Sequence, residues 1–92
     1  MVEKKLKITP LAEEKIKELT NGSRENVLDF FNNIDKYLQE RSYKLLFKGE
    51  QGNFYYRECK NVYVIFTVDE KHILILDILT KVELEKIGPE ES

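Results

Sequence analysis

The pattern of apolar and polar positions predicts a small antiparallel sheet in the second half of the chain. Three short runs are rich in β-branched and aromatic residues: Phe54–Glu58, Val62–Val68 and His72–Leu79. Polar segments around Cys59–Asn61 and Asp69–Lys71 separate these runs. Runs of this length with such short gaps predict an antiparallel meander. Tyr43–Phe47 is a further strand candidate, and the Gly-containing segment Lys48–Asn53 is expected to be the loop that follows it.

The start of the chain predicts a strand followed by a helix. Val2–Ile8 alternates roughly between apolar and charged residues, which predicts a short strand at an edge of the sheet. Thr9 can accept hydrogen bonds from free N–H groups at a helix start, and Pro10 fits the first helical position because its missing N–H is not needed there. The first helix is therefore expected over Pro10–Leu19.

A second helix is expected over Arg24–Arg41, after Asn21 and Gly22 end the first helix and Ser23 caps the next one. Apolar residues recur along it at intervals of three and four, at Val27, Leu28, Phe31, Ile34, Tyr37 and Leu38. The resulting order predicts an α+β fold. It has an N-terminal strand, an antiparallel two-helix hairpin and a four-stranded antiparallel meander, with the helices packed on one face of the sheet.

Composition fits one small globular domain over residues 1–92, with residues 88–92 expected to be a frayed tail. The chain is 41% hydrophobic and 35% charged, and it has no apolar run near the roughly 20 residues of a membrane span. No signal region is visible at the N-terminus, so we expect a cytoplasmic protein with no membrane partner. The single cysteine, Cys59, excludes an internal disulfide and a multi-cysteine metal site, and no metal or cofactor is expected.

Positive charge is concentrated in the first half of the predicted sheet, although the net charge is −2. Between residues 41 and 63, only Glu50 and Glu58 oppose five bases: Arg41, Lys44, Lys48, Arg57 and Lys60. Tyrosines are interleaved with bases on the predicted strands. Bases of single-stranded RNA stack on aromatic rings while cations meet the phosphates, so this pattern is typical of an RNA-binding surface. A solvated surface with no ligand is the alternative interpretation.

Motifs for other chemistries are missing from the sequence, which contains no Gly-rich phosphate loop, HExxH or CxxC. His72 stands at a predicted hairpin turn, which favours a turn residue over a catalytic base. Asp77 is an acid inside an apolar run, and we expect it to pair with a neighbouring lysine or arginine. Cys59 is expected to fill space at a strand end.

The order of elements, together with four short motifs, resembles the RelE/ParE superfamily of toxins from type II toxin–antitoxin pairs. In that family a Leu-Lys-Gly turn precedes a Tyr-Tyr-Arg-x-Arg strand, and Phe47–Gly49 and Tyr55–Cys59 stand at those places. The next strand commonly reads Tyr-Arg-Val-Ile-Tyr, where this chain has Val62–Phe66. The last strand often reads Val-Leu-Asp-Val-x-His-Arg, where this chain has Ile75–Lys81.

The resemblance implies a metal-independent endoribonuclease that cuts mRNA on the ribosome, and it implies a cognate antitoxin as partner. For a RelE-like member with a rearranged catalytic set, it implies catalytic roles for Arg57, Tyr63 and Lys81, and RNA-binding roles for Lys48, Tyr56 and Lys60. Tyr56 is the alternative to Tyr63 for proton transfer. Basic residues of this family hold the phosphate and offset developing charge, and a Tyr or His near the end assists proton transfer.

The chain departs from the family at several of these positions. Cys59 replaces the second strand arginine, Tyr63 the third-strand arginine and Thr80 the usual histidine, while Glu85 stands near the place of the terminal tyrosine. Losing one charge-stabilising group can cost on the order of a hundredfold in rate. Two alternatives therefore stay open: a non-catalytic ParE-like or degenerate member that binds gyrase or an antitoxin, and an unrelated small α+β interaction domain.

Overall fold

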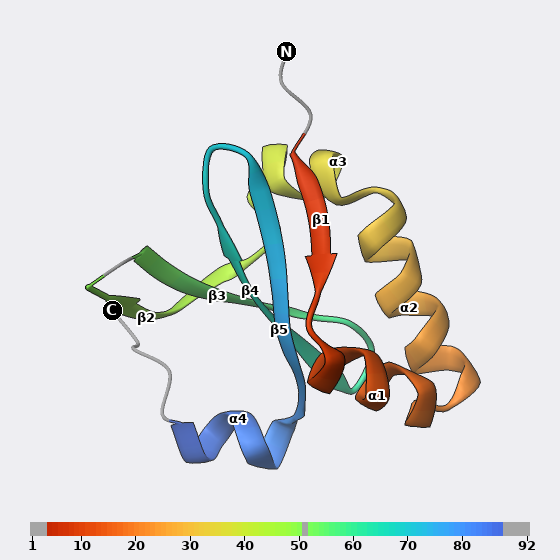
Figure 1. Ribbon diagram of the computed structural model, residues 1–92. Helices are drawn as coiled ribbons and strands as arrows, with labels where there is room; N and C mark the ends of the chain where they lie inside the picture. Colours follow the sequence, from red (N-terminus) through yellow and green to blue (C-terminus); the bar gives the residue numbers. More distant parts are fainter. Residues whose placement is uncertain (1–3, 51, 88–92) are drawn as a thin grey trace.

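The computed structural model describes residues 4–50 and 52–87, which form a five-stranded sheet with helices on both of its faces (Figure 1). In chain order the elements are β1 (Lys5–Ile8), α1 (Pro10–Glu18), α2 (Asn21–Asn32), α3 (Ile34–Gln39), β2 (Lys44–Gly49), β3 (Gly52–Glu58), β4 (Val62–Val68), β5 (His72–Thr80) and α4 (Lys81–Ile87). The tail expected at residues 88–92 and the first residues of the predicted N-terminal strand lie outside the described part.

The strands lie in the order β1-β5-β4-β3-β2, so β1 and β2 form the two edges of the sheet. Strands β2 to β5 pair antiparallel in sequence order, which confirms the predicted meander. β1 pairs parallel to β5, with Lys5 opposite His72, which confirms the expected edge position of the first strand. The chain closes tightly between β2 and β3, where Gly49 is opposite Gly52, so the loop expected over Lys48–Asn53 is largely strand.

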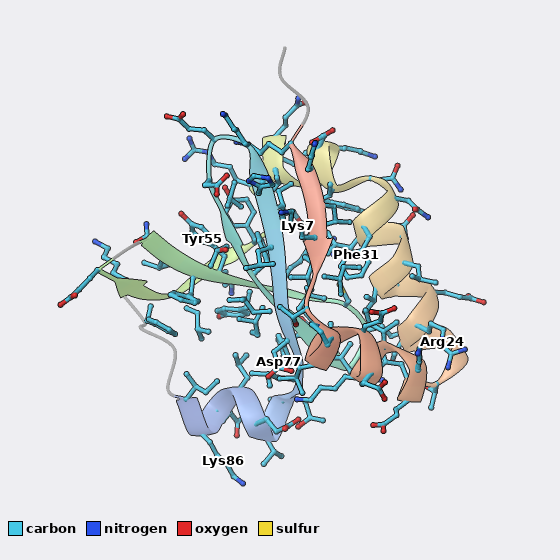
Figure 2. All side chains as sticks on the ribbon, viewed as in Figure 1. Lys7, Arg24, Phe31, Tyr55, Asp77 and Lys86 are labelled. Carbon is cyan, nitrogen blue, oxygen red and sulfur yellow. The ribbon has the colours of Figure 1, made fainter. Side chains whose placement is uncertain are left out.

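Helices α1, α2 and α3 cover one face of the sheet. Figure 2 shows Phe31 of α2 on the side of the helix that faces β1. The main core lies between these helices and the sheet, with its largest fully buried side chains including Phe30, Phe66, Ile73 and Ile75. Thr9 caps α1, because its Oγ1 accepts a hydrogen bond from the Ala12 N–H at 3.2 Å, and Pro10 is the first residue of the helix. The predicted start of this helix is confirmed.

The second predicted helix differs in its bounds and in its buried stripe. It begins at Asn21, not at Arg24, and Ser23 is not its cap but a buried residue whose hydroxyl donates to the Lys60 carbonyl oxygen at 2.8 Å. The helix breaks at Asn33, whose backbone leaves the helical region (φ −121°, ψ 30°). Val27, Phe31 and Ile34 of the predicted stripe are buried. Leu28 is 43% exposed, however, and Phe30, which lies outside the predicted stripe, is fully buried.

The sheet's other face carries a second, smaller core under α4, a helix that the sequence analysis did not predict. Leu84 of α4 packs with three buried residues of the sheet, Leu46, Ile65 and Leu79. The prediction that helices pack on one face therefore holds for α1 to α3 and fails for α4. In Figure 1, α4 lies at the far end of β5, away from the other helices except the start of α1.

Candidate functional site

A cleft of about 520 Å³ opens beside the end of β3, on the side of the sheet near α4. We call it the β3 cleft. It is lined by Arg41, Ser42, Tyr43, Lys44, Tyr56, Arg57, Glu58, Tyr63, Lys81, Leu84 and Glu85. The register explains its position, because the pairing of β2 with β3 begins at Lys44 and Tyr56. Beyond that pair the last residues of β3 have no neighbour on this side, and the chain before β2 passes around an open edge.

Strand alternation places two tyrosines and a glutamate on the same side of the sheet. Tyr56 and Glu58 are two residues apart on β3, and Glu58 lies directly opposite Tyr63 on β4. The rings of Tyr56 and Tyr63 meet edge to face, with centroids 5.9 Å apart. Both tyrosines pack against the smaller core, so their rings are held by the sheet while the cleft reaches them from solvent.

Lys81 and Glu85 reach the cleft from α4, whose start is fixed by reciprocal hydrogen bonds. The Glu83 N–H donates to Thr80 Oγ1 at 3.2 Å, and the Thr80 N–H donates to Glu83 Oε1 at 3.0 Å. This capping box is visible in the sequence as Thr-x-x-Glu and is the signal that could have predicted α4. Hydrogen bonds from the backbone and the side chain of Thr80 hold the pKa of Glu83 below its ordinary value, because they favour the charged carboxylate.

Arg57 lies at the border of the cleft, but its guanidinium packs under the helices. The guanidinium carbon is 4.1 Å from the ring centroid of Tyr37 and 5.1 Å from that of Phe30. Nη1 donates to the Glu58 carbonyl oxygen at 3.2 Å and to Cys59 Sγ at 3.3 Å. Nε is buried and has no acceptor among the described residues. These contacts give Arg57 a packing role at the boundary between the main core and the cleft.

Two groups beside Arg57 have shifted pKa values. Burial raises the pKa of the Cys59 thiol more than the neighbouring guanidinium lowers it. The thiol is fully buried and stays protonated near neutral pH, as expected for a residue that fills space. The Tyr37 hydroxyl donates to Asp29 Oδ2 at 2.6 Å, and this bond to a carboxylate raises the pKa of Tyr37.

The structure brings four of the six sequence-predicted residues together at the β3 cleft: Tyr56, Arg57, Tyr63 and Lys81. Lys48 and Lys60 are not among the lining residues. Lys48 lies near the end of β2, opposite Asn53. Lys60 lies in the turn between β3 and β4 and extends over the first turn of α2, where a Cβ on Gly22 would come within 2.9 Å of its Nζ.

Sequence reasoning missed the roles of four charged residues that line the cleft: Arg41, Lys44, Glu58 and Glu85. The excess of bases between residues 41 and 63 was a signal for the first two. Glu58 could not be placed without the strand register, and Glu85 could not be placed without α4. Four basic and two acidic side chains line the cleft, so it carries a net positive charge.

The two isolated polar residues in the last predicted strand are accounted for by local contacts. Asp77 forms an ion pair with Lys15 of α1 at 2.7 Å, which confirms the expected pairing, and Figure 2 shows it beside that helix. His72 begins β5 after a turn held by Asp69, whose Oδ1 accepts from the Lys71 N–H at 2.8 Å. His72 therefore borders the predicted turn but is the first residue of the strand and not a turn residue.

Within residues 4–50 and 52–87, no group of three or more His, Cys, Asp or Glu side chains is placed to hold a metal ion. In the same part of the chain, no helix has the length and apolar character needed to cross a membrane. The β3 cleft offers cations, phenol rings and two carboxylates. Such a set can bind an anionic, ring-bearing ligand and can supply groups for proton transfer.

Comparison with solved structures finds the same fold in a chain of a RelE–RelB complex and in YoeB. A chain of the archaeal RelE–RelB complex from Pyrococcus horikoshii OT3 superposes with a TM-score of 0.70 at 18% sequence identity, over 85% of this chain and 94% of that one. YoeB from Staphylococcus aureus, solved as a dimer, gives a TM-score of 0.63 at 19% identity, over 83% and 94%. No protein-family model and no curated protein sequence matches this chain. The chain therefore has the fold seen in these two proteins.

Proposed function

We propose that this chain, with its RelE-type fold, is the toxin of a type II toxin–antitoxin pair and cleaves mRNA on the ribosome without a metal. The observation that supports the proposal most is the β3 cleft, where Tyr56, Tyr63 and Lys81 meet in one net positive hollow. These three residues were assigned to the site from the sequence, Tyr63 at a position where the resembling family has an arginine. Their convergence from three different elements is what an RNA-cleaving site on this fold would require.

Metal-free RNA cleavage needs three kinds of group around one phosphate. The ribose 2′-oxygen attacks the neighbouring phosphorus and loses its proton to a base, while the bond to the 5′-oxygen breaks and that oxygen receives a proton. Products are a 2′,3′-cyclic phosphate and a free 5′-hydroxyl. A cation beside the phosphate stabilises the negative charge that builds up on its oxygens in the transition state.

The cleft supplies a candidate for each role. Lys81 stabilises the developing phosphate charge. Tyr63 donates the proton that the leaving 5′-oxygen receives. Glu58, directly opposite Tyr63 in the sheet, is the nearest carboxylate by register and serves as the acceptor of the 2′-hydroxyl proton. Tyr56 gives a flat surface on which a base can stack.

The other three residues assigned from the sequence have supporting roles in this proposal. Arg57 supports the cleft by holding the end of β3 against α2 and α3, through its contacts with Phe30 and Tyr37. Lys48 and Lys60 lie outside the cleft, and their proposed part is contact with more distant phosphates of the RNA or the ribosome.

The proposed partner is an antitoxin encoded with this chain. The RelE-type chain from Pyrococcus horikoshii was solved in a RelE–RelB complex, so one protein of the same fold forms such a pair. Because the proposed targets are ribosomes and mRNA, we propose that the protein acts in the cytoplasm.

A second candidate function is binding without cleavage. It is favoured by Cys59 and Tyr63, which stand where the resembling family has arginines, and by the packing of the Arg57 guanidinium under the helices. In that case the fold and the antitoxin would remain, and the target would be a protein such as gyrase.

Cleavage of mRNA on purified ribosomes, with Lys81→Met compared with Lys86→Met, tests the proposed function. Both lysines lie on α4, but only Lys81 lines the cleft, and Lys86 points away from the sheet (Figure 2). We expect Lys81→Met to slow cleavage by on the order of a hundredfold, because a charge-stabilising group is lost. Lys86→Met is expected to cleave at the wild-type rate. Equal rates for the two variants would contradict the role of Lys81 in the cleft, and no cleavage by the wild-type protein would favour the non-catalytic candidate.

A further inference from the structure

We propose that Arg41 and Lys44, which the sequence motifs do not assign, bind phosphates of the RNA strand that enters the β3 cleft. The inference rests on the proposed function and names the residues that hold its substrate. It gives the cleft a pair of cations on the wall formed by the turn between α3 and β2. Lys81, on α4, is the cation of the other wall.

Arg41 occupies a backbone position that favours glycine. Helix α3 ends in a Schellman arrangement, in which the Arg41 N–H donates to the Leu38 carbonyl oxygen at 3.1 Å and the Ser42 N–H donates to the Tyr37 carbonyl oxygen at 3.0 Å. Arg41 has φ 54°, in the left-handed region where a side chain raises the backbone energy. A glycine would lower the backbone energy of this turn, whereas the arginine keeps a cation at the cleft.

Lys44 is placed by the first pair of the β2–β3 ladder. It lies directly opposite Tyr56, and residues opposite each other in an antiparallel pair project to the same face of the sheet. Tyr56 faces the cleft, so Lys44 presents its ammonium group to the same side, next to the ring on which an RNA base would stack. This arrangement pairs one phosphate contact with one stacking contact.

The charges of Arg41 and Lys44 are free for a ligand. Ion pairs among residues 4–50 and 52–87 join Lys15 to Asp77 and His72 to Asp69, and neither Arg41 nor Lys44 takes part in one. Both side chains are exposed. The guanidinium of Arg57, by contrast, is occupied by two aromatic rings, a thiol and a carbonyl oxygen. Arg41 and Lys44 therefore supply cationic groups that Arg57 does not offer to the strand.

The test measures binding of a fluorescein-labelled single-stranded RNA dodecamer by anisotropy, over a series of salt concentrations. The variant is Arg41→Gly/Lys44→Gln, and the matched control is Lys5→Gln/Lys7→Gln on β1, at the opposite edge of the sheet. Each phosphate contact of a single strand contributes about 0.7 to the slope of log affinity against log salt, so the variant's slope should be smaller by about 1.4. Its affinity should fall by roughly fivefold or more, to the same extent for oligo(A) and oligo(U), because phosphate contacts do not read sequence.

Thermal melting of the same variants separates binding from folding. Glycine relieves the positive φ at position 41, so the melting temperature of Arg41→Gly should rise while its RNA affinity falls. Wild-type affinity in the double variant would overturn the inference and leave the proposed function intact. A lower melting temperature for Arg41→Gly would assign Arg41 to folding and also overturn it.

The two proposals fail in different ways. If the wild-type protein binds RNA but does not cleave mRNA on ribosomes, the proposed nuclease function is wrong, while the roles of Arg41 and Lys44 in binding RNA stand. A wild-type protein that binds neither the dodecamer nor mRNA-programmed ribosomes would overturn both proposals together.

Discussion

At the scale of single residues, strand geometry gives the neighbours Tyr56 and Arg57 different roles, one at the cleft and one in packing under the helices. The two residues are adjacent on β3, so their side chains leave opposite faces of the sheet. Tyr56 meets Tyr63 at the cleft, whereas the Arg57 guanidinium stacks on Tyr37 under the helices. The same five-residue motif that resembles a catalytic strand thus contributes one residue to the site and one to the core boundary.

Removing the Arg57 side chain should destabilise the fold. We expect Arg57→Ala to lower the free energy of unfolding by about 1–2 kcal/mol, because two cation–π contacts and the packing of the aliphatic stem are lost. Urea denaturation followed by circular dichroism measures this change. Lys44→Ala is the control, since Lys44 is an exposed cation close to the cleft, and its unfolding should match the wild type. An unchanged unfolding midpoint for Arg57→Ala would show that the guanidinium contacts contribute nothing.

The two tyrosines should respond differently to loss of their hydroxyl groups. Tyr63→Phe is expected to reduce ribosome-dependent cleavage by roughly a hundredfold or more, because a proton-transfer group is removed. Tyr56→Phe keeps the ring on which a base stacks and should cleave within a few-fold of the wild-type rate. Single-turnover cleavage assays compare the two variants. If Tyr56→Phe is the slower enzyme, the proton-transfer role belongs to Tyr56.

Residue roles could be predicted from the sequence only where a motif fixed the register. Tyr63 and Lys81 were assigned from motifs, and the β4–β5 ladder places Leu79 opposite Tyr63, so Lys81 follows two residues later at the same end of the sheet. Phe30 was missed as a core residue because the predicted stripe was drawn through Leu28 and Phe31, although Phe30 also lies at helical spacing from buried neighbours on both sides. Glu58 and Arg41 carry no motif, and only the fold brings them to the cleft.

At the scale of elements, α4 contributes three of the eleven residues that line the cleft, although it is only seven residues long and was not predicted. A helix this short has little intrinsic stability and spans fewer than two full turns, so the periodicity of its sequence gave no clear signal. The Thr80–Glu83 capping box and the burial of Leu84 hold it against the sheet. The strands, by contrast, were predicted well because β-branched and aromatic runs with short polar gaps leave few alternatives.

Loss of the cap should loosen α4 and, with it, the position of Lys81. We expect Thr80→Ala to lower the free energy of unfolding by about 1 kcal/mol, the usual effect of removing a helix cap. Chemical denaturation measures the change, and hydrogen exchange of the α4 amides shows where it occurs. Thr80→Ser keeps the accepting oxygen and should behave as the wild type. If both variants unfold alike, the hydroxyl does not cap the helix.

The same contacts predict how the stability of α4 depends on acidity. The folded pKa of Glu83 lies below its ordinary value of 4.5, so the folded state favours the carboxylate form. Stability from this group is fully present above the ordinary pKa and is lost as pH falls through the lowered folded pKa. Glu83→Gln should therefore flatten the loss of stability below about pH 4.5, as measured by denaturation at successive pH values. An unchanged acid profile would contradict the assignment.

At the scale of the whole molecule, the two faces of the sheet differ: one covers the main core, and the other carries the smaller core and the cleft. Helices α1 to α3 and one face of the sheet enclose the main core, while the opposite face and α4 form the smaller core and the β3 cleft. The N-terminal strand, the helices that follow it and the antiparallel meander were predicted from the sequence, whereas α4 was not. The superposition on a chain of the RelE–RelB complex and on YoeB shows the same fold. Placement of the site did not follow, because it depends on an edge where β2 stops short of the end of β3.

Mapping the 5′ ends of ribosome-bound mRNA after induction of this chain alone in a bacterial host tests the central claim most directly. If the β3 cleft is a ribosome-dependent nuclease site, growth should arrest and new 5′ ends should appear at a fixed position within codons. Both effects should be lost with Lys81→Met and retained with Lys86→Met. Arrest without new ends, or normal growth with soluble, folded protein present, would contradict the claim that this protein cleaves mRNA.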